Sequence, residues 1–96
     1  MPEDVDDAFY KRADAHIDLS NEQLKDAARG KVSASMMYSL ARFNAWVSAC
    51  EFQAPEQMAG ALEETLDYFT AEYRKMLEEN FNNYITNFSK YMEPDK

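Results

Sequence analysis

The second half of the chain carries a single apolar stripe at helical spacing, with no Gly or Pro to interrupt it. Its nine members are separated by steps of 4-3-4-4-4-3-4-3 residues and are Leu62, Leu66, Phe69, Tyr73, Leu77, Phe81, Tyr84, Phe88 and Tyr91. At about 100° per residue these side chains fall within an arc of roughly 120°, the width of a core-facing helix surface. The pattern predicts a long amphipathic helix, because a strand would need alternation.

Together with capping signals, the apolar pattern predicts three long helices, over approximately residues 6–29, 34–51 and 55–92. Gly30 is suited to the position that follows the end of the first helix, and Ser33 is a good N-cap for the second. Pro55 suits the first position of the third, because its missing N–H would have no intrahelical partner there. We therefore predict an all-α fold, with one domain over 1–96 and a bundle of three long helices, of which the third is the longest.

The third helix contains a weak segment. Asn80, Asn82 and Asn83 are poor helix formers. The stripe also shifts phase here, since three successive steps of four residues make a stutter in a heptad pattern. A bend near residues 79–83 is one outcome, but the stripe stays on one face, so we expect a continuous helix.

The second helix is apolar or small over most of its circumference, and Arg42 and Glu51 are its only charged residues. Its most regular apolar positions repeat at 4-3-4-3 spacing and are Met36, Leu40, Phe43, Val47 and Cys50. A helix of this kind is usually central, so we expect the other two helices to cover it on two sides and Cys50 to be buried.

Net charge and cysteine content limit the classes of function and the compartments that suit this chain. The formal net charge is −8, which disfavours binding to nucleic acid or to an anionic membrane. Cys50 is the only cysteine, so no intrachain disulfide can form. The acidic N-terminal segment lacks the apolar region of a secretory signal, and no apolar run approaches the ~20 residues that span a bilayer. We expect a cytoplasmic protein.

Candidate chemistry is sparse. His16 is the only histidine, and Asp14 and Asp18 lie at i−2 and i+2, on the opposite side of a helix. We therefore predict no metal, no cofactor and no catalytic residue. Arg42 and Asn44 are polar residues within the least polar helix, and an intramolecular salt bridge is the simplest role for Arg42. The alternative is a small-molecule binder or enzyme that uses an inter-helix pocket near His16, Arg42 and Asn44.

The main functional hypothesis is a non-enzymatic protein–protein interaction module. The third helix is too long for the other two to cover, which leaves a C-terminal apolar patch formed by Phe81, Tyr84, Ile85, Phe88 and Tyr91. Either a bend near residues 79–83 folds the end of the chain back, or a second copy covers it. We expect a twofold homodimer with the aromatic ends in contact. An acidic decoy for a nucleic-acid-binding protein is a further alternative.

Three blocks of sequence carry a resemblance to a known family, and they read FYKRADAHIDLSNEQL (9–24), GKVSASMMYSLARFNAWVSA (30–49) and YFTAEYRKMLEENFNNYITNFSKYM (68–92). The chain resembles a family of small, acidic, all-helical proteobacterial proteins that is described only as a domain of unknown function. The resemblance implies a cytosolic all-helical bacterial protein and supplies no catalytic residue.

Overall fold

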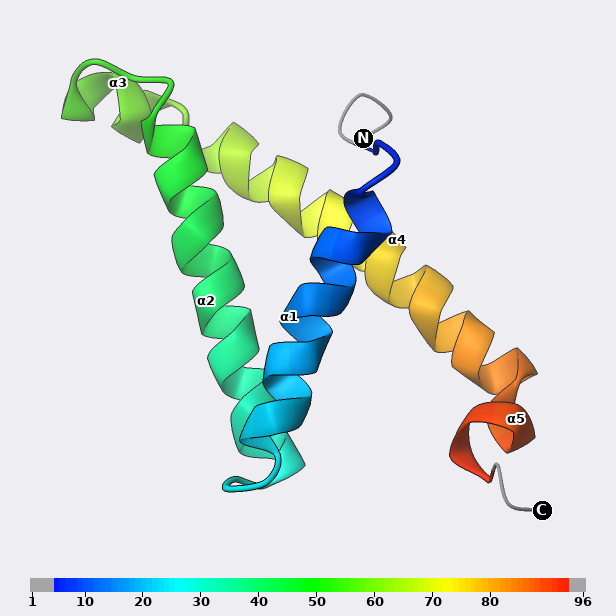
Figure 1. Cartoon of the computed structure of the whole chain (residues 1–96). Coiled ribbons are helices and arrows are strands. Elements are labelled where there is room, and N and C mark those ends of the chain that lie inside the picture. Colours follow the sequence, from blue (N-terminus) through cyan, green and yellow to red (C-terminus); the bar gives the residue numbers. More distant parts are fainter. Residues whose placement is uncertain (1–4, 94–96) are drawn as a thin grey trace. The chain divides into compact units, whose positions relative to one another are not determined.

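A computed structural model of the chain describes residues 5–93, which contain helices and no strand. The helices are α1 (Phe9–Gln23), α2 (Arg29–Ala49), α3 (Pro55–Gly60), α4 (Leu62–Thr86) and α5 (Phe88–Met92), as Figure 1 shows. These residues form two compact units that divide between Val47 and Ser48. The all-α prediction is confirmed. The three-helix bundle is not, because five helices are present, and a single domain stays a prediction.

Asp6 organises the start of α1. Its Oδ1 accepts hydrogen bonds from the backbone N–H of Ala8, at 3.2 Å, and from Nη2 of Arg12, at 3.0 Å. The first bond forms an Asx-type turn, which sets the chain direction just before the helix. The second makes an ion pair with a side chain one turn into α1.

The turn between α1 and α2 comes earlier than the sequence suggested. We expected the first helix to run to Arg29 and Gly30 to follow its end, whereas α1 ends at Gln23 and Gly30 lies inside α2. Gly30 does not have positive φ, so it makes no left-handed cap. The N–H groups of Lys31 and Val32 instead bond to the carbonyl of Ala28, which starts α2 several residues before Ser33.

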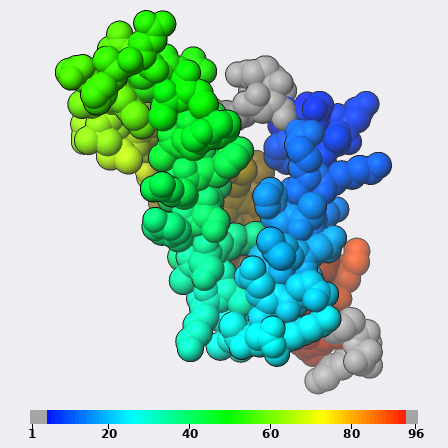
Figure 2. All heavy atoms as spheres, turned by 60° about the vertical axis from the view of Figure 1, so that its left-hand side comes forward, coloured from blue at the N-terminus to red at the C-terminus, as the bar shows by residue number. Residues whose placement is uncertain are grey.

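The α1–α2 hairpin is closed near its turn. Val32, in the first turns of α2, is 7% exposed and is the one buried residue among those the structure describes. Farther along, the Ser20 hydroxyl donates to Sδ of Met36 at 3.8 Å. Figures 1 and 2 show that the two helices meet at this end and diverge toward the other.

The predicted third helix, 55–92, is divided at both ends. Pro55 occupies the first turn of α3, as expected, after Ala54 in extended conformation. Ala61 then departs from helical geometry with φ −98° and ψ 4°, so α3 ends and α4 begins after it. The longest helix is therefore α4, with 25 residues.

The helix is continuous across residues 79–83, as we expected, because α4 continues through all three asparagines to Thr86 and the alternative bend is absent. Asn80 Nδ2 bonds back to the carbonyl of Met76 at 2.8 Å, which satisfies its side chain within the helix. The break falls at Asn87, with φ −114° and ψ 30°. Asn87 Nδ2 donates to the Asn83 carbonyl at 3.1 Å and to Asn83 Oδ1 at 2.7 Å. These side-chain bonds compete with continuation of the helix.

We expect Asn87→Ala to join α4 and α5 into one helix. Alanine favours helix over asparagine by roughly 0.5 kcal/mol and removes the side-chain bonds to Asn83. Backbone NMR shifts of residues 86–89 should become helical, and helical circular dichroism should increase. The control Asn82→Ala, inside α4, should leave the break in place. A non-helical residue 87 in the Asn87→Ala variant would contradict this account.

The hydrogen bond from Arg12 lowers the pKa of the Asp6 carboxyl below its ordinary value of 3.8. Because the folded pKa lies below the unfolded one, the resulting stabilisation is present above pH ~4 and is lost as the pH falls through the folded value. We expect Arg12→Ala to raise the Asp6 pKa in a carboxyl NMR titration. Lys11→Ala should leave it unchanged, and an unchanged value in Arg12→Ala would exclude the pair as the cause.

Candidate protein-interaction surface

The five residues predicted as an interface lie on the last turns of α4 and on α5. We call them the aromatic surface, and their exposed fractions are Phe81 65%, Tyr84 49%, Ile85 62%, Phe88 53% and Tyr91 40%. All five are therefore accessible in the single chain. Water in contact with this much ring and aliphatic surface is unfavourable by about 25 cal/mol per Å².

The break at Asn87 folds part of this surface onto itself. The rings of Tyr84 and Tyr91 lie with centroids 4.9 Å apart and planes inclined by 43°. Asn83 Nδ2 donates to the Tyr91 hydroxyl at 3.3 Å, so the same asparagine contacts both Asn87 and Tyr91. The turn thus brings Tyr91 back against α4, but the exposed fractions show that it does not cover the aromatic surface.

Four of the five members of the aromatic surface, all except Tyr91, lie in a segment without charge. Residues 80–89 contain no Asp, Glu, Lys or Arg, although 29% of the chain is charged. The first cation beyond it, Lys90, has its Nζ 5.9 Å from the centroid of the Tyr91 ring. The centres of protein interfaces are similarly depleted of charge and enriched in aromatic residues.

The remainder of the α4 stripe is accessible too. Leu62, Leu66, Tyr73 and Leu77 are between 41% and 54% exposed. Phe69, the other member within the first half, is half-buried. The apolar face that the sequence predicted is therefore real as a helix face, and it continues unbroken from Leu62 into the aromatic surface.

The second helix is not covered as expected. Leu40, Phe43 and Val47 of its regular apolar positions are exposed, and Cys50, for which we predicted burial, is exposed as well. The rings of Phe43 and Trp46 are in contact at 5.6 Å, yet both remain more than half exposed. Sequence periodicity identified these positions as apolar, but it could not say what packs on them.

An ion pair flanks the α4 stripe. Lys75 Nζ lies 2.9 Å from Glu72 Oε2. Their hydrogen bond is the largest of the effects that lower the pKa of the Glu72 carboxyl and raise the pKa of the Lys75 amine. Each group therefore keeps its charge over a wider pH range.

The three residues of the alternative polar pocket lie in one unit, with His16 in α1 and Arg42 and Asn44 in α2. His16 and Arg42 are exposed and Asn44 is half-buried. Within residues 5–93, the structure gives none of these side chains a hydrogen bond or ion pair. The salt bridge expected for Arg42 is therefore not formed with any described residue.

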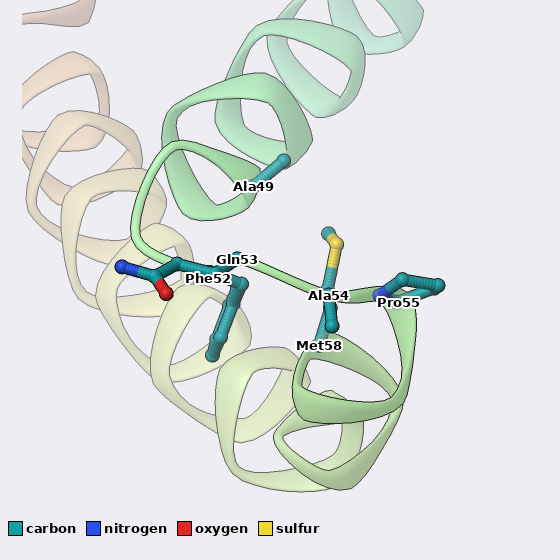
Figure 3. A pocket seen from close by; sticks show the side chains of 6 residues that line it. All are labelled: Ala49, Phe52, Gln53, Ala54, Pro55 and Met58. Atoms are coloured by element: carbon teal, nitrogen blue, oxygen red, sulfur yellow. The ribbon is translucent and has the colours of Figure 1, made fainter.

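A shallow pocket of about 260 Å³ lies elsewhere, where α2 gives way to α3. Its walls are mostly apolar and are formed by Ala49, Phe52, Gln53, Ala54, Pro55 and Met58 (Figure 3). The backbone N–H of Gln53 donates to Gln57 Oε1 at 2.8 Å, which fixes the turn. The Gln53 carboxamide points away from Met58 and Pro55. The pocket thus lacks the converging polar groups that orient a small molecule.

Two further kinds of site are absent from the described part of the chain. No three His, Cys, Asp or Glu side chains are placed to hold a metal ion there. Nor does any helix in that part combine the length and apolar character needed to cross a bilayer.

Comparisons with known proteins agree with the fold and leave the chemistry open. Residues 9–85 match a family model described as "Protein of unknown function (DUF3144)". The chain belongs to this family. The match ends before Phe88 and Tyr91, so part of the aromatic surface lies beyond the family region.

A solved structure supports the same fold. The chain is similar to the protein NB7890A from Shewanella sp, determined by NMR, with 40% identity and a TM-score of 0.76. The similarity covers 96% of this chain and 98% of that one. A comparison with curated proteins finds no match.

We expect purified protein to contain less than about a tenth of an equivalent of zinc, iron or manganese, because bound metals need several converging ligands. Elemental analysis of the protein after gel filtration without chelator measures this. A value near one equivalent per chain would contradict it and would direct attention to His16.

Proposed function

We propose that the chain is a non-enzymatic protein–protein interaction module that acts through the aromatic surface and forms a homodimer. The observation that carries this proposal is the accessibility of the aromatic surface after the chain has turned at Asn87. Of the two ways to cover the patch, the turn is present and leaves the rings exposed. A second protein surface would remove them from water.

The size of the surface supports a partner. With about 200 Å² for a Phe or Tyr side chain, the exposed fractions of the four rings correspond to roughly 400 Å² in one copy. Ile85 adds to this area. Monomers seldom expose contiguous apolar patches beyond a few hundred Å² unless the patch has a function.

The chemistry of the surface favours a protein partner over a charged polymer. A net charge of −8 and an uncharged contact segment offer no row of cations for phosphates. Tyrosine and asparagine can hydrogen-bond at the edge of an apolar contact, as interface residues commonly do. The exposed thiol of Cys50 suits a reducing compartment, so we place the protein in the cytoplasm.

The alternative, a small-molecule binder or enzyme at His16, Arg42 and Asn44, has less support. Their side chains form no recorded polar contact that would orient them toward one ligand. None of them lines the described pocket, whose walls are mostly apolar. A ligand-induced thermal shift that disappears in Arg42→Ala would favour this alternative over the interaction module.

We expect light scattering coupled to size exclusion to give about twice the chain mass of 11.1 kDa at tens of micromolar protein. Phe88→Asp should split this dimer, because a carboxylate without a partner would be buried at a cost of about 2 kcal/mol or more. That cost raises the dissociation constant by at least about 30-fold.

The matched control is Tyr38→Asp, which places the same charge on an exposed aromatic residue of α2. This variant should remain dimeric, and circular dichroism should show that both variants keep their helices. A wild-type mass of one chain at these concentrations would rule out the homodimer. If the Phe88→Asp variant remains dimeric, the aromatic surface is not part of the dimer contact.

A further inference from the structure

The α4 stripe reads the same in both chain directions. From Leu66 to Tyr84, within one unbroken helix, its steps are 3-4-4-4-3, and extending it to Leu62 and Phe88 adds a step of four at each end. The centre of this pattern is residue 75. We infer that the second copy binds antiparallel along α4, with the twofold axis at the level of residue 75 on the stripe face; the inference rests on the homodimer of the proposed function.

The symmetry includes the irregular part of the stripe. A strict heptad pattern alternates steps of three and four, whereas this stripe has three steps of four between Phe69 and Phe81. The stutter is centred on residue 75. When one helix is reversed about that point, the stutters of the two copies therefore lie at the same level. Facing layers then stay in phase within α4, and they are Leu66–Tyr84, Phe69–Phe81 and Tyr73–Leu77, each pair joining one copy to the other.

Side-chain size distinguishes the two directions. Leucines occupy the first turns of the stripe and rings occupy its last turns. In a parallel pair, rings would face rings at one end and leucines would face leucines at the other, so the helices would splay. The antiparallel pair places a leucine against a ring in two of the three layers named above. Large side chains opposite smaller ones keep facing helices evenly spaced and closely packed.

The area is sufficient for a specific contact. With about 200 Å² for a ring and somewhat less for a leucine, the exposed stripe residues of α4 offer roughly 500 Å² per copy. Two copies then bury roughly 1,000 Å², which is the lower bound for a biological interface. A contact confined to the aromatic ends would leave Leu66 exposed, whereas the antiparallel pairing covers it.

Distances between spin labels test the direction. Glu64 and Glu79 both lie on α4 opposite the stripe. Glu64→Cys and Glu79→Cys, each in full-length Cys50→Ser protein, make two singly labelled dimers with the same change of charge. With the axis at residue 75, the two labels are about 33 Å apart along the axis at position 64 and about 12 Å apart at position 79.

We expect the distance measured at position 64 to exceed that at position 79 by more than about 10 Å. Equal distances at the two positions would overturn the antiparallel pairing while leaving the homodimer intact. A monomeric Cys50→Ser parent, with the wild type monomeric as well, would remove both proposals.

A second measurement does not depend on labels. In the antiparallel dimer Leu66 is buried against Tyr84 of the other copy, so Leu66→Ala should raise the dissociation constant at least about tenfold. Leu19→Ala, a change of the same size at an exposed residue of α1, should alter it less than about twofold. A dimer unaffected by Leu66→Ala would confine the contact to the aromatic ends and overturn the pairing.

Discussion

An amphipathic helix gains most of its stability when another surface covers its apolar face, because backbone propensity alone is marginal in water. This constraint governs the whole chain. Among residues 5–93, Val32 alone is buried, and the unit that begins at Ser48 contains no buried residue. The helices are well formed and their apolar faces are well defined, yet neither unit encloses a core of its own. In the proposed homodimer, a second copy supplies the covering surface.

The sequence predicted periodicity better than boundaries, and the reasons are physical. The stripe extends over many turns, so the helical character of Leu62–Thr86 follows from a large number of side chains that agree. The break at Asn87 depends on two hydrogen bonds from one amide to Asn83, and such local bonds are possible for every asparagine in the segment. Asn80 forms a comparable bond to Met76 without any break. Composition identified the weak region and could not select the residue.

The aromatic surface, too, could be predicted from the sequence only in part. Spacing was enough to place Phe81, Tyr84 and Phe88 on one face. It could not show that Tyr91 would turn back against Tyr84, because that contact requires the change of direction at residue 87. Likewise, apolar spacing in α2 was taken to mean burial, and Phe43 and Cys50 are exposed. Periodicity reports which side of a helix is apolar; the partner of that side is a tertiary property.

The positions of the two ends of α4 are also consistent with an antiparallel pairing of its apolar face. The helix extends from Leu62 to Thr86, so its midpoint is residue 74, within one residue of the centre of the stripe. In an antiparallel pair centred there, each helix ends close to where the other begins, and neither apolar face extends beyond its partner. The breaks at Ala61 and Asn87, which the stripe alone did not predict, thus match the helix length to the pairing.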